Sequence, residues 1–422
     1  MFREYISDSH NELIIYAADN FSQFPRRDSS IVSRTDRALA VACSNDLVLL
    51  RSRLDQDYHN WIRSLGLGSD LVIDYGAGMK GLSLSELIII NPEPVIEIIR
   101  ETNRSPVYVP WFSSNIEKEA AKVIGAELFG ASEAETLKYN DKASFKNICT
   151  QLDIPVVNGV LFNIQAQNSK NYSSMANIVK KLLYNHRGVI IRGTIGELGT
   201  SLYKTTGHDI AEIYQSILCS GEKTLLIEPF LNVYSSPNDQ WIISRDKSIH
   251  HIGTNEQICI DEMVHAGNSN NIQLSEQSLA YIYKTSRKIL SRMVSTGYIG
   301  VVGIDYIVTD TGIFPIENNA RFNGSSYVNL IVDNIKNATG SIPLWKSMKV
   351  KIPPCSFTEL MAKLKDNLYN GVKTDSIFPY NCEDLNETGS FSVIYLFENT
   401  KAFSILEQRI REITVESTLI LE

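Results

Sequence analysis

The stretch IGVVGIDYIVTDTGIFPIENNARFNGSS, residues 299–326, decides the fold that we predict for this chain. Its first half, Val301 to Thr309, is rich in β-branched and aromatic residues, as β-strands are. Thr311-Gly312 interrupts the apolar run and Ile313 to Ile316 resumes it, so two strands flank a tight turn. The pattern therefore predicts a β-hairpin.

Polar residues gather on one face of this hairpin. With the turn centred near Thr311, Asp305 falls opposite Glu317, and the two-residue repeat of a strand puts Asn319 on the same face. Arg321 lies just beyond. The acids and the carboxamide offer oxygen ligands that suit Mg²⁺; the alternative is the solvated face of an antiparallel hairpin. The apolar flanks favour burial, and buried acids are rare unless they are paired or bind metal.

Composition excludes several classes of protein. The 422 residues, 43% of them hydrophobic, suffice for two to four packed units. A net charge of -8 and a pI near 5.5 argue against nucleic acid as a partner. The six cysteines are scattered without metal-site spacing, as expected for reduced thiols in the cytoplasm. The N-terminal segment lacks an export signal and no window reaches the ~18 apolar residues of a membrane span.

The first 115 residues alternate between short apolar runs and helical stretches. We expect strands at residues 13–18, 46–50, 71–74 and 107–111, with helices such as 83–90 and 95–101 between them. Alternation of this kind predicts a parallel α/β layer.

A glycine-bearing loop follows a strand in the middle of the chain. Val189 to Arg192 is expected to be a strand, residues 193–201 a loop, and residues 202–204 the returning strand. The candidate phosphate contacts in the loop are Gly196, Gly199, Thr200 and Ser201. Glycines let backbone N–H groups approach phosphate oxygens, although a hairpin with a flexible tip has the same sequence pattern. No G-K-[ST] motif opens a helix, so the loop is not a Walker A loop.

The last part of the chain combines antiparallel strands with a long helix. We expect strands at residues 240–244 and 248–259, a polar loop at 262–268, a helix at 275–296 and a small α/β tail at 355–422. His265, in the predicted loop, is a candidate to orient a substrate carboxylate or to act as a base. The alternative is a histidine without a catalytic role.

The hairpin resembles the C-terminal signature of the ATP-grasp ligases. The resemblance rests on Gly303-Ile304-Asp305, Glu317-Asn318-Asn319-Ala320-Arg321 and Gly324-Ser325-Ser326. Earlier segments occur in the family's order, at residues 139–146, 153–157, 189–204 and 225–231. The resemblance implies an α/β (α+β) ATP-grasp fold in four parts. These are a pre-ATP-grasp domain at 1–115, a linker and nucleotide lid at 116–232, a catalytic subdomain at 233–350 and a tail at 351–422.

The same resemblance implies ATP and Mg²⁺ as cofactors and assigns residues to them. Asp305, Glu317 and Asn319 would hold Mg²⁺, and Arg321 would stabilise the transferred phosphoryl group. The residues implied in nucleotide binding are Lys142, Arg192, the glycine loop and, on the strand that reads the adenine, Glu228, Phe230 and Leu231. Most of the family has lysine where Arg192 stands, and arginine keeps the charge with a different geometry. From the residue alone, an ordinary helix-face lysine is the favoured interpretation of Lys142.

The implied activity is ATP-dependent ligation. A substrate carboxylate becomes an acyl phosphate and is coupled to an amine, with release of ADP and phosphate. The layout is similar to the peptide ligase of pheganomycin biosynthesis and to the ligase of butirosin biosynthesis that loads glutamate onto a carrier protein. The partners expected are therefore small amino-acid or peptide substrates, an acyl carrier protein if the acceptor is a thiol, and a second copy in a homodimer. A small-molecule kinase is the alternative from another class.

Overall fold

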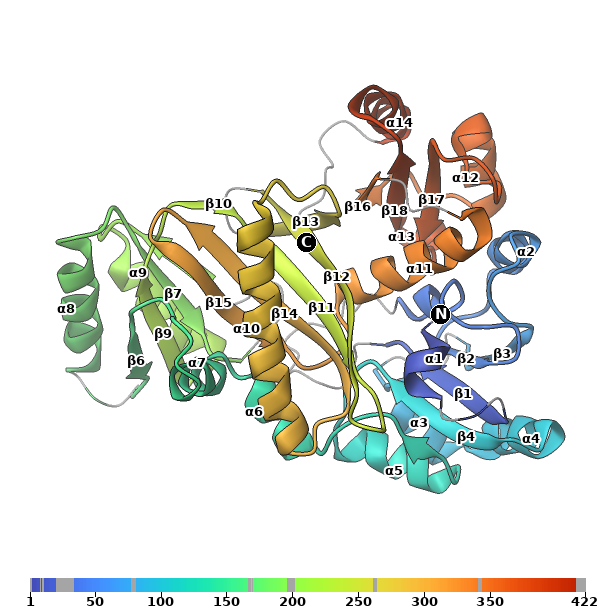
Figure 1. Cartoon of the computed structure of the whole chain (residues 1–422), viewed down its shortest axis with the longest axis horizontal. Coiled ribbons are helices and arrows are strands. Elements are labelled where there is room, and N and C mark those ends of the chain that lie inside the picture. Colours follow the sequence, from blue (N-terminus) through green and yellow to red (C-terminus); the bar gives the residue numbers. More distant parts are fainter. Residues whose placement is uncertain are drawn as a thin grey trace.

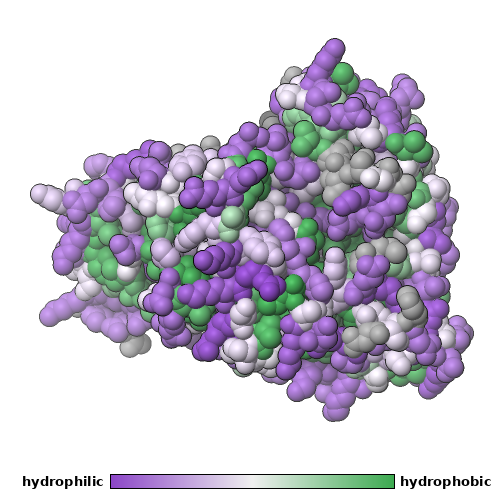
Figure 2. Space-filling view, viewed as in Figure 1, coloured by the Kyte–Doolittle hydropathy of each residue, from purple (hydrophilic) through white to green (hydrophobic). Residues whose placement is uncertain are grey.

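The computed structural model describes residues 2–7, 9, 11–19, 34–76, 81–165, 168, 170–195, 202–260, 264–340 and 344–414. Three sheets organise these residues (Figure 1). A parallel sheet forms the N-terminal part, a four-stranded antiparallel sheet lies at the opposite end of the molecule, and a nine-stranded sheet lies between them. Hydrophilic residues cover most of the face in Figure 2, with hydrophobic patches on the left, where Figure 1 places the four-stranded sheet.

The N-terminal sheet has the order β3-β2-β1-β4-β5, with parallel pairing throughout. Its strands are β1 (Glu12–Ala17), β2 (Leu47–Leu50), β3 (Leu71–Asp74), β4 (Ser105–Pro110) and β5 (Glu127–Leu128). The helices are α1 (Arg3–Ile6), η1 (Thr35–Ala38), α2 (Gln56–Ser64), α3 (Leu84–Ile90), α4 (Glu93–Thr102) and α5 (Asn115–Val123). All of β1 and β2 is buried, because helices cover both faces of a parallel sheet. The predicted parallel α/β layer is confirmed.

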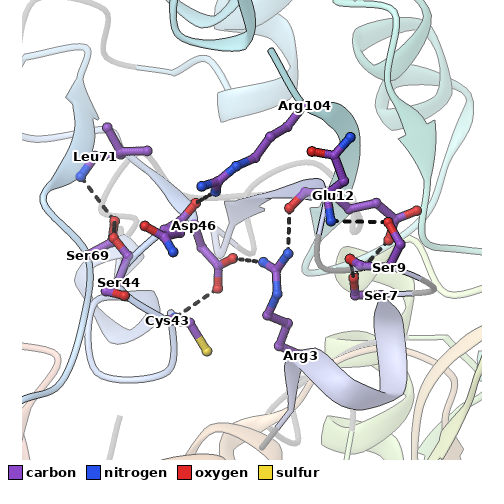
Figure 3. Close-up of polar contacts among 12 residues, drawn as sticks. Arg3, Ser7, Ser9, Glu12, Cys43, Ser44, Asp46, Ser69, Leu71 and Arg104 are labelled. Atoms are coloured by element: carbon purple, nitrogen blue, oxygen red, sulfur yellow. Dashed lines mark hydrogen bonds and ion pairs between the residues drawn. The ribbon is translucent and has the colours of Figure 1, made fainter. Parts of the chain in front are cut away.

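Polar contacts fasten the start of the chain to this sheet (Figure 3). Arg3 of α1 pairs with the buried Asp46 and also donates to the carbonyl of Glu12. Asp46 in turn accepts from the Cys43 backbone N–H at 2.8 Å, and Arg104 donates to the Asn45 carbonyl at 3.0 Å. These bonds hold the segment that leads into β2.

The four-stranded sheet has the order β6-β9-β7-β8 and is antiparallel. Its strands are β6 (Val160–Asn163), β7 (Val189–Gly193), β8 (Leu202–Thr205) and β9 (Thr224–Pro229). Helices α6 (Glu133–Asn140) and α7 (Lys142–Gln151) lead into it, and α8 (Asn171–Leu183) and α9 (Ile210–Ser220) share its core. The predicted strands on either side of the glycine loop are confirmed.

The nine-stranded sheet runs β10-β14-β11-β12-β13-β16-β18-β17, with β15 also paired to β14. Its strands are β10 (Val233–Ser235), β11 (Pro237–Ile243), β12 (Ile249–Ile260), β13 (Val264–Ser269), β14 (Gly300–Thr309), β15 (Gly312–Asn319), β16 (Leu344–Lys351), β17 (Ser376–Tyr380) and β18 (Ser390–Phe397). The remaining helices are α10 (Glu276–Ser295), α11 (Gly324–Thr339), α12 (Phe357–Leu364), η2 (Lys365–Asn367), α13 (Leu385–Thr388) and α14 (Thr400–Ile413). α10 packs with Trp241 and Val302, whereas α11 packs with Ile242 and Val301, so the two helices cover opposite faces.

One expectation for the last part of the chain differs from the structure. The predicted loop at 262–268 is wrong from Val264 onward, because Val264–Ser269 is strand β13, paired on both sides. Gly267 looked like a loop residue, but a Cβ there would overlap the Ser347 carbonyl of β16, so the close strand approach requires glycine. The strands of the tail, β17 and β18, continue the central sheet through β16.

Within the described part of the chain, no helix has the length and apolar character needed to cross a membrane.

Candidate active site

The predicted hairpin is present with the predicted register. β14 and β15 pair antiparallel, with Asp305 opposite Glu317 and Gly303 opposite Asn319. A register shift follows Asp305, between Asp305 and Tyr306. A bulge re-aims side chains where it occurs. Because directly paired residues of two strands point to the same side, the two acids lie together on one face of the sheet.

Asp305 is surrounded by carboxamides. Its Oδ1 accepts from Gln257 Nε2 at 2.6 Å and from Asn238 Nδ2, and its Oδ2 accepts from Asn319 Nδ2 at 2.9 Å. Burial, and then the neighbouring carboxylate of Glu317, raise the pKa of Asp305 to about 7. The amide donors oppose this shift, because they stabilise the charged form. The Asp305 carboxyl therefore titrates near neutral pH.

Glu317 has the opposite electrostatic balance. Its Oε1 lies 3.0 Å from Lys142 Nζ, and Lys142 is buried at the start of α7. Burial alone would raise the pKa of Glu317, but Lys142 and Arg321 outweigh it and the pKa lies below its ordinary value. Glu317 is therefore charged at pH 7, whereas Asp305 is only partly ionised there. Two neighbouring carboxylates avoid repulsion when one of them is protonated.

Arg321 reaches this site from just beyond β15. Its Nη1 donates to Asn140 Oδ1 at 3.1 Å and to Asn319 Oδ1, and its guanidinium carbon lies 5.1 Å from the centre of the Trp111 ring. Since the Asn319 oxygen faces Arg321 and its NH₂ group faces Asp305, the amide must turn over before its oxygen can bind a cation.

Two more of the predicted nucleotide residues, Arg192 and Glu228, lie in the four-stranded sheet, and Phe230 and Leu231 directly follow it. Glu228 is 3% exposed and accepts from Arg192 at 2.7 and 3.0 Å and from Lys146. Burial opposes ionisation of Glu228, yet Arg192 and then Lys146 hold its pKa below the ordinary value. Phe230 follows β9, with Lys204 Nζ 3.8 Å from its ring centre, and Leu231 comes next.

The remaining predicted residues are not part of this constellation. Gly196, Gly199, Thr200 and Ser201 lie outside the described residues. His265 is on β13, three strand positions from β14, which puts their backbones about 14 Å apart at the usual strand spacing. Its Nε2 lies 3.2 Å from Asn268 Oδ1, which also accepts from Ser325 at 2.8 Å. Burial lowers the pKa of His265, so the ring is neutral at pH 7.

The donor set fits Mg²⁺ better than a transition metal. In the described ranges, no three His, Cys, Asp or Glu side chains are grouped to hold a metal. Asp305 and Glu317 supply two carboxylates, and Asn319 supplies an amide oxygen once it turns. Mg²⁺ is commonly bound by one or two carboxylates together with substrate phosphates. Lys142 and Arg321 add the positive charge that polyphosphate needs.

Several residues that shape the site were not predicted from the sequence. Lys146 lies four residues after Lys142, so the helical repeat alone puts both lysines on one face of α7. Gln257 and Asn238 carried no such signal, because they reach Asp305 from neighbouring strands. Trp111 comes from the N-terminal sheet and is likewise distant in sequence.

Comparisons with known proteins agree with this geometry. A family model described as L-aspartate--L-methionine ligase, ATP grasp, matches residues 192–319. No curated protein matches the chain. Among solved structures, biotin carboxylase from Campylobacter jejuni has a TM-score of 0.62 at 14% identity, over 96% of this chain and 91% of that one. N5-carboxyaminoimidazole ribonucleotide synthetase from Thermus thermophilus has a TM-score of 0.59 at 11% identity, over 97% and 100%.

The chain therefore has the ATP-grasp fold, and the predicted fold class is confirmed. Fold and family-model match together support an ATP-dependent ligase as its general class. ATP-grasp enzymes use ATP and Mg²⁺. A further structural neighbour, the biotin carboxylase domain of Hydrogenobacter thermophilus 2-oxoglutarate carboxylase, is described in complex with MgADP, at a TM-score of 0.60 and 12% identity over 96% and 89%. The predicted cofactors agree with these findings.

Proposed function

We propose that this chain is a ligase that uses ATP to activate the carboxylate of an amino acid or peptide and joins it to an amine. The observation that carries the proposal is the convergence of Asp305, Glu317 and Asn319 with the cations Lys142 and Arg321 on an ATP-grasp hairpin. The family model that matches residues 192–319 is named for a ligase of two amino acids, which supports amino acids as the substrate class.

The proposed reaction has two steps. A carboxylate oxygen of the donor attacks the γ-phosphorus of ATP, the bond to the β-phosphate oxygen breaks, and ADP leaves. The amine nitrogen then attacks the acyl carbon, loses a proton and expels inorganic phosphate. Mg²⁺, when bound, would neutralise charge on the β- and γ-phosphates.

Each residue has a part in this proposal. Asp305, Glu317 and Asn319 would hold the metal, and Lys142, whose Nζ lies 3.0 Å from Glu317, would contact phosphate oxygens. Arg321 stabilises the charge on the transferred phosphoryl group. Arg192, with Glu228, Phe230, Leu231 and the loop residues Gly196, Gly199, Thr200 and Ser201, binds the nucleotide.

His265 is proposed to act at the acceptor end. At about 14 Å from β14 it is too far to touch the transferred phosphoryl group. Its neutral ring can instead hydrogen-bond a remote polar group of the acceptor substrate and so orient it.

The test is hydroxamate formation. The protein is incubated with MgATP, hydroxylamine and each amino acid in turn, and ADP and hydroxamate are measured. We expect one or a few carboxylates to stimulate both products in equal amounts, and we expect Glu317→Gln to abolish both. If no carboxylate stimulates ADP release, the proposal is wrong. A product that keeps the phosphate identifies a kinase instead, and ligation only to a carrier-protein thiol identifies the thiol route.

A further inference from the structure

Arg321 is held by a contact from a distant part of the chain. Asn140 and Asn319 both accept from its Nη1. The face of Trp111, with its ring centre 5.1 Å from the guanidinium carbon, adds a cation–π contact beside these hydrogen bonds. Arg321 is buried, at 7% exposure, so its neighbours limit how the guanidinium can turn.

Trp111 is itself firmly anchored between the N-terminal sheet and the catalytic hairpin. Its backbone N–H donates to the Ala17 carbonyl at 2.9 Å, and its carbonyl accepts from the Phe322 N–H at 3.0 Å. Phe322 is the residue directly after Arg321. The ring and the arginine that it faces are therefore linked by a backbone hydrogen bond as well as by the cation–π contact.

A second guanidinium lies near the same ring. The Arg37 guanidinium carbon is 5.7 Å from the centre of the Trp111 ring and 4.4 Å from that of Tyr327. Arg37 is buried and donates to the Ala18 carbonyl at 3.1 Å. Arg37 thus also contacts the Trp111 ring, and this ring connects the N-terminal part of the chain to Arg321.

The indole N–H of Trp111 does not set the orientation of the ring through a hydrogen bond to a described residue. A buried tryptophan normally finds a partner for its N–H. Trp111 is 4% exposed, and its Nε1 has no hydrogen-bond partner in the described structure. The ring is therefore placed by its cationic and apolar neighbours and not by a hydrogen bond.

We propose that Trp111 is a positioning residue for Arg321, with Arg37 backing it. The inference rests on the proposed function, in which Arg321 stabilises the transferred phosphoryl group. It gives the N-terminal sheet a part in catalysis, because that sheet supplies the surface on which the guanidinium is aligned. Trp111 does not touch substrate in this proposal and acts through Arg321.

The experiment compares two substitutions that both leave an apolar side chain at the site. Trp111→Phe keeps an aromatic face, and Trp111→Leu keeps apolar bulk without one. With ADP release as the assay, we expect kcat of W111L to fall roughly 10- to 100-fold, as misplacement of a reacting group does. W111F should stay within about 3-fold of the wild type, and KM for ATP should change by less than about 3-fold in both. The unfolding midpoints of the two variants should match.

Two controls separate the outcomes. Combining W111L with Arg321→Ala should add no further loss to that of R321A, because the tryptophan acts through the arginine. Trp61→Leu, which alters a buried tryptophan packed on Phe357 and Phe378, should lower stability while leaving kcat unchanged.

Equal kcat values for W111L and W111F, or additive losses in the double variant, would overturn the role of Trp111 alone. Absence of ADP release by the wild type with every carboxylate would instead overturn the proposed function.

Discussion

At the scale of single residues, Asp305 carries the sharpest physical consequence. Three carboxamides donate to it, and Glu317 sits across the strand pair. Amide donors stabilise the carboxylate without giving the site a compensating positive charge, so its pKa stays raised, at about 7. If Asp305 binds Mg²⁺ as proposed, metal and proton compete for the same oxygens near neutral pH.

The Mg²⁺ requirement should depend on pH for this reason. Below pH 7 Asp305 is mostly protonated and a cation must displace the proton, whereas above pH 7 the carboxylate is free to bind. We expect the Mg²⁺ concentration for half-maximal ADP release to be roughly tenfold higher at pH 6 than at pH 8. Titrations with Mg²⁺ at fixed ATP across this range measure it. A midpoint that does not move with pH would contradict the assignment of Asp305.

Glu228 offers a second prediction at this scale. It is buried between Arg192 and Lys146, so Glu228→Gln leaves two partly buried cations without their carboxylate. We expect a loss of stability of roughly 3 kcal/mol, seen as a lower urea midpoint. KM for ATP should rise as well, because Arg192 loses its fixed orientation. Glu212→Gln, at an exposed position on α9 in the same subdomain, is the matched control and should leave both values unchanged.

At the scale of elements, the hairpin β14–β15 depends on a glycine at Gly303. A Cβ there would overlap Asn323 Nδ2 and Gln240 Nε2, and Gly303 pairs with Asn319. Gly303→Ala should therefore cost about 1–3 kcal/mol and lower kcat, because the displaced amides lie beside the proposed metal ligands. Gly324→Ala is the control, since a Cβ there meets nothing within 4 Å. Equal melting temperatures for the two variants would show that the close approach is absent.

Sequence periodicity predicted elements well where the pattern was local. The register of Asp305 against Glu317 followed from a two-residue repeat and a visible turn. Strand β13 was missed from Val264 onward, because Gly267 and Asn268 are poor strand formers whose places are set by partners on β12 and β16. The amide donors to Asp305 were missed for the same reason. The order of strands decides which residues contact one another across a sheet, and local sequence patterns do not predict this order.

At the scale of the whole molecule, Arg245 joins two sheets. It lies in the β11–β12 turn and pairs with Glu12 at 2.8 Å and with Glu127, both of the N-terminal sheet. Its side chain and that of Glu12 are mostly buried, so Arg245→Ala breaks a largely buried ion pair and should cost roughly 3 kcal/mol. Arg100→Ala breaks the exposed pair with Glu93 and should cost under about 1 kcal/mol. Urea unfolding of both variants gives the comparison, and similar midpoints would refute the difference.

The continuous central sheet also limits how the molecule can be shortened. β16 pairs with β13 on one side and with β18 on the other, along the full run Leu344–Lys351. A truncation after Lys351 would therefore not remove a detachable module. It would strip one side of β16 and leave the backbone N–H and C=O groups of alternate residues along this eight-residue strand without partners on that side. Such a shortened chain would be prone to aggregation, although the hairpin with the proposed metal ligands would be intact in sequence.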